Sequence, residues 1–362
     1  MLRCLEFLFK FIVRSQQLYL QLGDGDPASY FQPGVSFESS IGQFFISIEH
    51  LMSEKDNTSL TAQGAVLQYL PTIVDQLTMV FSPFQLTKLL VQFVENIGFK
   101  NSSNERLIES RIKCIIKIIE TDLFSNLPDC QELLLQELSD QVVCLLDDNI
   151  QMEVTSALLQ NLIDKVSLSP PSQRVILSKL LHPLMGRLKS FLRTSPEEQE
   201  DEVGQVVPSL NSSLLAIVRI LTESSNYEWY LKSQNLALRR FLDELFQMIE
   251  LIVTSPLVYP KPWLQLKLLA SRTILGVIKA TSRTLFAHFL SRSDFSAELW
   301  SAFFSVSIAF LGQDFLQLEH FVPIKRLKIL EEFGDMRQGR VQNPWLALFY
   351  LAKHNTNVKY QF

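Results

Sequence analysis

Apolar residues recur at helical spacing along almost the whole chain, in stretches of several turns separated by short polar or proline-containing breaks. Alternating runs of β-branched residues, which are typical of strands, are rare. Glycine is scarce, with 12 in 362 residues. Sandwiches, barrels and dinucleotide-binding sheets need glycine-rich turns. The pattern therefore predicts an all-α protein.

The breaks divide the sequence into a series of predicted helices. They cover about 5–22, 37–52, 60–70, 71–81, 84–97, 104–121, 130–146, 152–166, 172–193, 206–223, 236–253, 263–280, 283–290, 295–311 and 323–336. Because the connections are short, we expect neighbouring helices to be antiparallel. This organisation favours an armadillo-like or HEAT-like α-solenoid of degenerate antiparallel helix pairs. The alternative is two compact all-α domains that divide near the acidic loop at 194–205.

Composition and charge exclude several classes of protein. Apolar residues make up 47% of the chain, too many for a largely disordered protein. The net charge of −5 offers no general basic field, so we expect no nucleic-acid partner. The four cysteines include no C-x-x-C pair, and we interpret all four as buried thiols in a reducing compartment: Cys4, Cys114, Cys130 and Cys144. The predicted location is the cytoplasm.

The apolar N-terminus is interpreted as a packed helix and not as a signal peptide. Glu6 and Lys10 interrupt the apolar run, and no small-residue cleavage site follows. One stripe at helical spacing contains Leu5, Leu8, Phe9, Ile12 and Val13. The longest apolar stretch, 299–311, is shorter than the ~20 residues that cross a bilayer.

No arrangement of residues in the sequence predicts catalysis, a metal site or a cofactor. No histidine lies three or four residues from another histidine or from a cysteine, as a helical metal site needs. GDGD at 23–26 lacks the other ligands of a calcium loop, so we interpret it as a turn. The acidic run at 197–202 follows Ser195-Pro196. It is either a phosphorylated regulatory loop or, as we favour, a solvated connection.

A basic cluster near the C-terminal end is the one candidate interaction surface. It comprises Lys325, Arg326, Lys328 and Arg337, with Arg340 nearby. Such a cluster can bind anionic headgroups or an acidic partner. The favoured interpretation is an ordinary exposed helix face, with Ile324 and Leu327 on the opposite, packed side. Aromatic residues between 295 and 321 recur at helical spacing and predict core positions: Trp300, Phe303, Phe304, Phe310, Phe315 and Phe321.

Five collinear segments resemble the helical middle region of dedicator-of-cytokinesis proteins, nearer their Rac-directed branches. They are LEFLFKFIVRSQQLY (5–19), GAVLQYLPTIVDQLTMVFSPFQL (64–86), DCQELLLQELSDQ (129–141), VYPKPWLQLKLLASRTIL (258–275), which contains a YP-x-x-W element, and ELWSAFFSVSIAFLGQDFLQLEHFVPIKRLKILEEFGDMR (298–337). None is a catalytic motif. By this resemblance, 1–337 is an armadillo-like scaffold and 338–362 is a divergent tail. The tail either folds as a short helix or is an artefact of splicing or gene assignment.

The resemblance implies a fragment of a guanine-nucleotide exchange factor for Rac-type GTPases. The family's exchange and lipid-binding domains have no counterpart in the sequence. We therefore expect a non-enzymatic scaffold that positions those domains, and that reaches a GTPase or the plasma membrane only through them. Homodimer contacts are a further expectation, because an interrupted solenoid exposes apolar surface. The alternative is a stand-alone adaptor that binds partners of the full-length protein.

Overall fold

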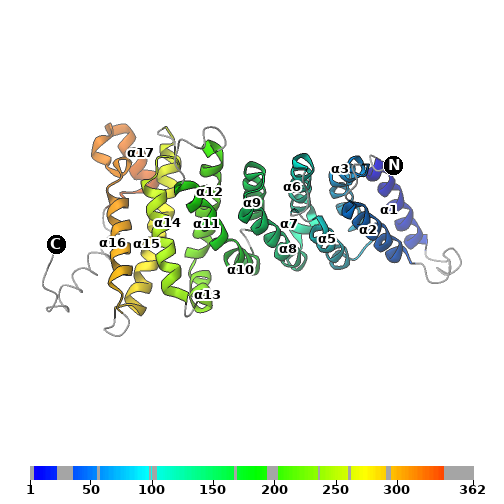
Figure 1. Cartoon of the computed structure of the whole chain (residues 1–362), viewed down its shortest axis with the longest axis horizontal. Helices are drawn as coiled ribbons and strands as arrows, with labels where there is room; N and C mark the ends of the chain where they lie inside the picture. Colours follow the sequence, from blue (N-terminus) through cyan, green and yellow to red (C-terminus); the bar gives the residue numbers. More distant parts are fainter. Residues whose placement is uncertain are drawn as a thin grey trace. The chain divides into compact units, whose positions relative to one another are not determined.

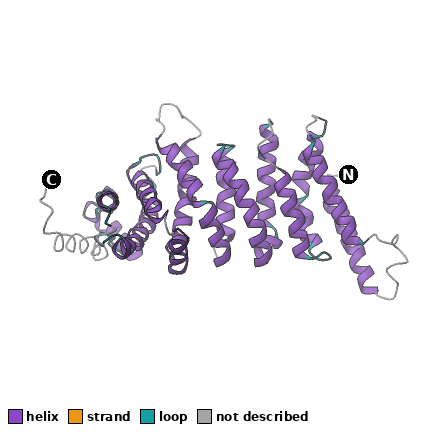
Figure 2. Cartoon of the chain, turned by 60° about the horizontal axis from the view of Figure 1, so that its bottom comes forward, coloured by secondary structure: helices purple, strands orange, loops and turns teal. Residues whose placement is uncertain are grey.

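The structure is a computed structural model. It describes residues 4–22, 36–54, 58–97, 99, 104–166, 169–193, 203–234, 237–259, 262–290 and 295–337. In these ranges every regular element is a helix, as Figure 2 shows, and none is a strand. The chain forms two units, 1–184 and 185–362. The all-α prediction is confirmed.

Unit 1 is a helical repeat with a period of three helices. Its helices are α1 (Leu5–Leu22), α2 (Phe37–Ser53), α3 (Leu60–Tyr69), α4 (Pro71–Leu77), α5 (Pro83–Ile97), α6 (Glu105–Glu120), α7 (Asp122–Asn126), α8 (Pro128–Asp147), α9 (Met152–Val166) and α10 (Pro170–Lys179). α2, α5 and α8 stack in one row, and α3, α6 and α9 stack in a second row (Figure 1). Short α4 and α7 precede the long pairs α5–α6 and α8–α9. Each repeat therefore adds a short helix to the expected pair.

Local sequence signals set the helix boundaries in unit 1. The Asn104 side chain accepts hydrogen bonds from the backbone N–H groups of Arg106 and Leu107, at 3.1 and 3.3 Å, and caps α6. α4, α8 and α10 each have proline in the first turn, where the missing N–H costs nothing. These signals explain why most predicted boundaries lie within a few residues of those observed.

The predicted helix at 172–193 is wrong, because the structure has two helices there. α10 ends at Lys179, and α11 runs over Leu181–Arg193. Leu180 between them has φ −100° and ψ −24°. Pro183 explains the break: it has no N–H for the carbonyl of Lys179, and its ring collides with that carbonyl in a continuous helix.

Unit 2 contains α12 (Val203–Thr222), α13 (Ser224–Gln234), α14 (Leu238–Thr254), α15 (Leu264–His288), α16 (Ala297–Leu311), the 3-10 turns η5 (Asp314–Leu316) and η6 (Leu318–His320), and α17 (Pro323–Phe333). α14 packs on α16, α12 packs on α15, and α17 packs on α15. α13 contacts both α12 and α14. Neither α13 nor the short α7 was predicted.

A single helix, α15, replaces the two that were predicted at 263–280 and 283–290. Thr281 and Ser282 suggested a break. Their hydroxyls instead donate hydrogen bonds to the carbonyls of Val277 and Lys279, both at 2.8 Å, within the same helix. Because these polar groups are satisfied inside the helix, they do not end it.

The aromatic prediction is confirmed for part of its set. Trp300, Phe303 and Phe310 are buried in unit 2, whereas Phe304, Phe315 and Phe321 are half-buried. The Trp300 indole N–H donates to the carbonyl of Phe289 at 3.1 Å. The Phe303 ring lies 5.7 Å from that of Phe246, in an edge-on arrangement.

The cysteine prediction is wrong for one position. Cys114 and Cys130 are buried and Cys144 is half-buried, but Cys4 is exposed. Burial raises the pKa of Cys114 to about 12. A thiol held neutral in this way is unreactive.

One described segment, Gln205–Thr222 in α12, is long and apolar enough to cross a bilayer by length and composition alone, and 56% of it is buried inside the fold. It also contains Asn211, which is fully buried. The amide of Asn211 donates to the hydroxyl of Tyr259 at 2.5 Å. These features are those of a core helix in a packed protein.

Buried amide side chains near helix starts bind the end of the preceding helix. Gln131, the fourth residue of α8, donates to the carbonyl of Phe124 in α7 at 3.1 Å and accepts from the hydroxyl of Ser172 in α10 at 2.9 Å. Gln63, the fourth residue of α3, donates to the carbonyls of Leu51 and Glu54 at the end of α2, at 2.9 and 2.8 Å.

We expect Gln131→Met to lower the free energy of unfolding of unit 1 by about 1–3 kcal/mol, because the side chain keeps its size but loses both bonds inside the core. Urea unfolding followed by circular dichroism measures the loss, and hydrogen exchange should rise at α7 and at the start of α8. Gln85→Met, at an exposed position of α5, is the matched control. Equal stability of the two variants would contradict this role for Gln131.

Two half-buried, hydrogen-bonded tyrosines in unit 2 contribute to a dependence of its stability on alkaline pH. Burial raises the pKa of Tyr227 and the pKa of Tyr259 to about 12 each. The Tyr227 hydroxyl also forms a hydrogen bond with Thr284 Oγ1 at 2.5 Å. A folded-state pKa above the ordinary value of ~10 means that the folded chain holds these protons more tightly. Their stabilisation is therefore complete below about pH 10 and is lost as pH rises through about 12.

Absorbance at 295 nm during an alkaline titration checks this expectation. In the native chain these two phenols should ionise together with the loss of helical circular dichroism, and Tyr259→Phe should remove one of them. Reversible ionisation of all tyrosines near pH 10, with the helical signal intact, is the contrary result.

Candidate interaction surface

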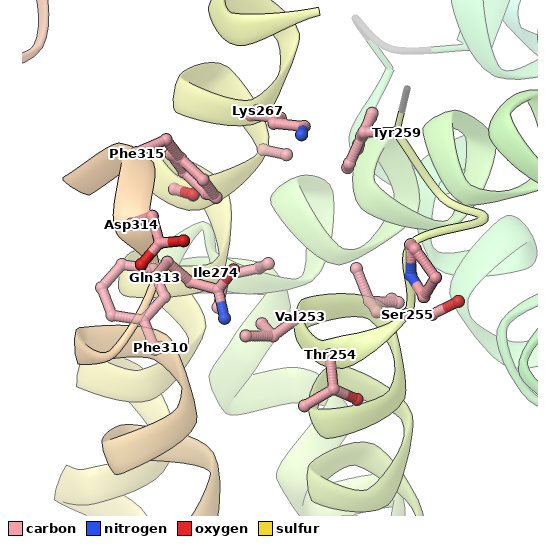
Figure 3. Close-up of a pocket in the computed structure, with 14 residues that line it drawn as sticks. Val253, Thr254, Ser255, Tyr259, Lys267, Ile274, Phe310, Gln313, Asp314 and Phe315 are labelled. Atoms are coloured by element: carbon pink, nitrogen blue, oxygen red, sulfur yellow. The ribbon is translucent and has the colours of Figure 1, made fainter. Parts of the chain in front are cut away.

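A cleft of about 360 Å³ opens in unit 2 between the end of α14, the first half of α15 and the segment that follows α16. Its walls are Ile252, Val253, Thr254, Ser255, Pro256, Tyr259, Lys267, Ala270, Ser271, Ile274, Phe310, Gln313, Asp314 and Phe315. Figure 3 shows Lys267 and Tyr259 together at one end, with Asp314 and Phe315 on the wall formed after α16. A cavity of this volume accommodates a few side chains.

Lys267 and Asp314 are the charged residues among those lining the cleft. The Lys267 ammonium lies 5.9 Å from the centre of the Phe315 ring, within range of a cation–π contact. Ile274 and Phe310 are buried and supply apolar wall surface. The cleft therefore offers apolar contact together with one cation and one carboxylate.

An exposed apolar strip borders the cleft at the start of α15. Its members are Trp263, Leu266 and Leu269, whose side chains are 41, 48 and 54% exposed. Leu266 and Leu269 flank Lys267 in sequence and follow each other by one helical turn. Large exposed apolar side chains that adjoin a hollow are typical of protein-binding surfaces. We call these three residues the α15 strip.

The YP-x-x-W element supplies residues to both the cleft and the strip. Tyr259 forms part of the cleft wall, and its hydroxyl accepts the hydrogen bond from buried Asn211. Trp263 is the residue before the first turn of α15 and lies at the surface. One residue of the element therefore holds the fold together, while the other contributes exposed apolar area.

The polar groups of the cleft do not form a catalytic arrangement. The Thr254 hydroxyl donates to the carbonyl of Glu250 at 2.7 Å, and the Ser255 hydroxyl accepts from the backbone N–H of Leu257 at 3.3 Å. Nucleophilic catalysis needs a hydroxyl or thiol paired with a base. In the part of the chain that the structure describes, no group of three or more His, Cys, Asp or Glu residues is placed to hold a metal ion. The geometry suits binding.

The basic cluster predicted from the sequence lies on α17, and part of its interpretation is wrong. Lys325, Arg326 and Lys328 are exposed, but so are Ile324 and Leu327, at 74 and 59%. Ile324 and Leu327 therefore do not form a packed side. α17 packs on α15 through its second half, where Ile329 is buried, so its first half faces solvent all round.

Arg337 stands apart from the other three cations because it is already paired. Its guanidinium forms a two-pronged ion pair with Glu319, in which Nη1 donates to Oε1 at 3.0 Å. This contact lowers the pKa of Glu319 to about 2. The backbone N–H of Arg337 donates a hydrogen bond to the carboxylate of Asp335 at 2.9 Å. Arg337 therefore ties the residues after α17 to η6.

Three sequence predictions fall on residues outside the described ranges. They concern GDGD at 23–26, the acidic run that follows Ser195-Pro196, and the tail at 338–362. The tail includes Arg340, which the sequence placed beside the basic cluster.

The α15 strip was not predicted, although the sequence contains a signal for it. Trp263, Leu264, Leu266, Leu268 and Leu269 place five large apolar residues within seven positions. A surface helix buries only one stripe, so a group this dense cannot be packed completely. A second example is α1, where Leu5, Phe9 and Val13 are buried but Phe11, which is not in that stripe, is 79% exposed.

Comparison of the sequence with known proteins shows which family has this helical region. Residues 1–350 match the sequence model of a family described as the dedicator of cytokinesis (DOCK) TPR region. The match continues beyond Arg337, where the recognised motifs ended. The human protein named Dedicator of cytokinesis protein 4 is 25% identical over 354 residues, and the mouse Dedicator of cytokinesis protein 3 is 26% identical over 352.

Each alignment covers 93% of this chain and 17% of the relative, so the chain spans about a sixth of the length of the curated relatives that it matches. No solved structure matches it. The family match extends over nearly the whole length, through both helical units and across the YP-x-x-W element. The chain belongs to the dedicator-of-cytokinesis family and corresponds to its helical TPR region.

Proposed function

We propose that the chain is a non-catalytic scaffold within a guanine-nucleotide exchange factor for Rac-type GTPases. It acts in the cytoplasm, holds membrane-binding and exchange domains at a defined separation, and offers a surface for protein partners in signalling to the actin cytoskeleton. The observation that carries the proposal is the α15 strip beside the cleft: large apolar groups are exposed there, while hydroxyls of the cleft are engaged in the fold's own hydrogen bonds.

The packing of unit 1 supports the spacing role. The helices from α1 to α6 each contact the helix three places later, and in α3 and α8 a buried amide also binds a carbonyl of the preceding helix. A stack of this kind has an apolar contact at every step, so it bends little under load. GTPases and membranes are reached through other domains of the longer protein in this proposal.

We expect the isolated chain to leave nucleotide release from a Rac-type GTPase unchanged, because in this proposal the exchange activity belongs to another domain of the longer protein. The measurement is release of a fluorescent GDP analogue with the chain at micromolar concentration. The exchange domain of a family member, assayed in parallel, is the positive control. Clear acceleration by the chain alone would show that it is itself an exchange factor.

A chimera tests the spacing role. The matching region of human Dedicator of cytokinesis protein 4 is replaced by this chain or by a glycine–serine linker of the same number of residues. A flexible linker has a variable end-to-end distance, so we expect the chain, and not the linker, to preserve GTPase activation in cells. Equal GTPase activation by the two chimeras would show that the chain does not act by holding the other domains at a defined separation.

A stand-alone adaptor that binds partners of the full-length protein is the second candidate, and the same exposed strip favours it. Expression of the chain beside an intact family member separates the two functions. An adaptor competes for shared partners and lowers GTPase activation, whereas a spacing element acts only within its own polypeptide.

A further inference from the structure

We propose that residues 344–351 form a short helix that packs on the exposed apolar side of α17. The proposal goes beyond the scaffold role, because it assigns an occupant from within the chain to a surface that the described residues leave open. α17 is the last helix in the described ranges, which end at Arg337. The segment begins seven residues later and is therefore attached close to the surface that it covers.

The exposed apolar side of α17 comprises two residues one turn apart. Ile324 and Leu327 are 74 and 59% exposed, and Val322, just before the helix, is 67% exposed. At about 100° per residue, Ile324 and Leu327 lie about 140° and 160° around the helix axis from Ile329. Ile329 is the buried residue of α17. The side opposite the packed one is therefore apolar at its first two turns, as in a helix that a further helix covers.

The residues after α17 turn back toward its beginning. Gly334 ends the helix in the left-handed conformation, with φ 71°, and its N–H donates to the carbonyl of Leu330 at 3.0 Å. Met336 is buried. The Arg337 guanidinium then pairs with Glu319 in η6, the turn that precedes α17. The chain is therefore held beside the start of α17 at the point where the segment follows.

The connection is long enough for the segment to reach the exposed side. Six residues, 338–343, separate Arg337 from Pro344. An extended connection of this length spans about 20 Å, and α17, with 11 residues, is about 16 Å long. Connections of about 2–8 residues are usual between helices that pack on each other.

The sequence of the segment, PWLALFYL, suits a helix that is covered by a neighbour. Asn343 is a favoured N-cap residue, and Pro344 fits the first helical position. The segment has no charged side chain. One face at helical spacing comprises Trp345, Leu348 and Phe349. So short a helix is not stable alone in water, so it needs an apolar surface on which to pack.

The family match supports the assignment independently of these patterns. It covers residues 1–350 and so includes all but the last residue of the segment. Sequence that belongs to the same helical region as α17 is expected to pack within that region.

An anionic membrane and a second copy of the chain are the competing occupants. Lys325, Arg326 and Lys328 suit anionic headgroups. Glu331, however, is exposed one turn after Leu327 on the same side, and its carboxylate opposes such a surface. A second copy binds only as its concentration allows, whereas a segment on a short connection has an effective concentration on the order of millimolar. We therefore favour the segment.

Hydrogen exchange of the whole 362-residue chain tests the contact. We expect the amides of 345–351 to exchange at least about tenfold more slowly than those of an isolated peptide with the sequence 338–362. Leu327→Asp should remove this protection and leave that of 329–333 unchanged, because Leu327 is largely exposed in the described fold. Ile308→Asp, at an exposed position of α16, is the matched control and should keep the protection.

Two changes in the segment test the contact from its other side. Leu348→Asp alters no described residue, and it should raise exchange both at 345–351 and at 322–328. With p-benzoylphenylalanine in place of Phe349, illumination should crosslink the segment to 321–328 of the same molecule. The yield should stay the same on about tenfold dilution, because the contact is intramolecular.

Exchange of 345–351 at the rate of the isolated peptide would overturn the proposal, and so would protection that survives Leu327→Asp. A crosslink that falls on dilution would identify a second copy as the occupant. Protection that appears only with vesicles of phosphatidylserine and phosphatidylcholine would identify a lipid surface, and either result would also overturn it. The spacing role is unaffected by these outcomes, because the chimera with the linker tests it separately.

Discussion

The contact of each long helix with the helix three places later is the interaction on which unit 1 depends. α2 meets α5 and α5 meets α8, while α3 meets α6 and α6 meets α9. Every such helix must be apolar on two sides, one for the preceding repeat and one for the following repeat. In α6 a single broad face meets both neighbours, since eight of its 16 residues are buried and they lie on one side of the helix. The same requirement contributes to the apolar content of the chain, which is 47%.

Stacking leaves helix ends inside the structure, and their carbonyl groups need donors. Buried amides meet this need at similar positions. Gln63 is the fourth residue of α3, Gln131 is the fourth of α8, and Asn226 is the third of α13; each donates to a carbonyl at the end of the helix before it. An amide suits the task because it donates without introducing a charge that would be costly to bury. The resemblance of the segment 129–141 to the family thus includes a residue with a defined structural task, Gln131.

The sequence predicts elements well wherever a local signal ends them. Proline in the first turn and a capping side chain, as at Pro71 and Asn104, act within a few residues and are visible in one dimension. The errors arise where the outcome depends on groups that satisfy one another in space. Thr281 and Ser282 resembled a break but bond within α15, and α13 lacks a strong apolar stripe because it only bridges α12 and α14. The exposed side of α17 could not be deduced, because helical periodicity gives the angle between faces and not the number of neighbours that cover them.

The candidate site follows from the same geometry. A stacked helix needs two apolar sides only when it has neighbours on both; one with fewer neighbours exposes the second side to solvent. In α1, which packs on α4, this leaves Phe11 exposed opposite the buried Phe9 and Val13. α15 contacts α12, α16, η5 and α17, and its strip is exposed only at the start of the helix. The two differ in charge: α1 pairs Lys10 with Glu6 at 2.7 Å, whereas the four cations of α15 have no acid on the same helix. Arg272 and Arg283 are exposed on α15, so this helix presents positive charge to solvent as well as the exposed leucines of the strip. The binding role that we propose for the chain therefore depends on whether the α15 strip is covered by a protein partner.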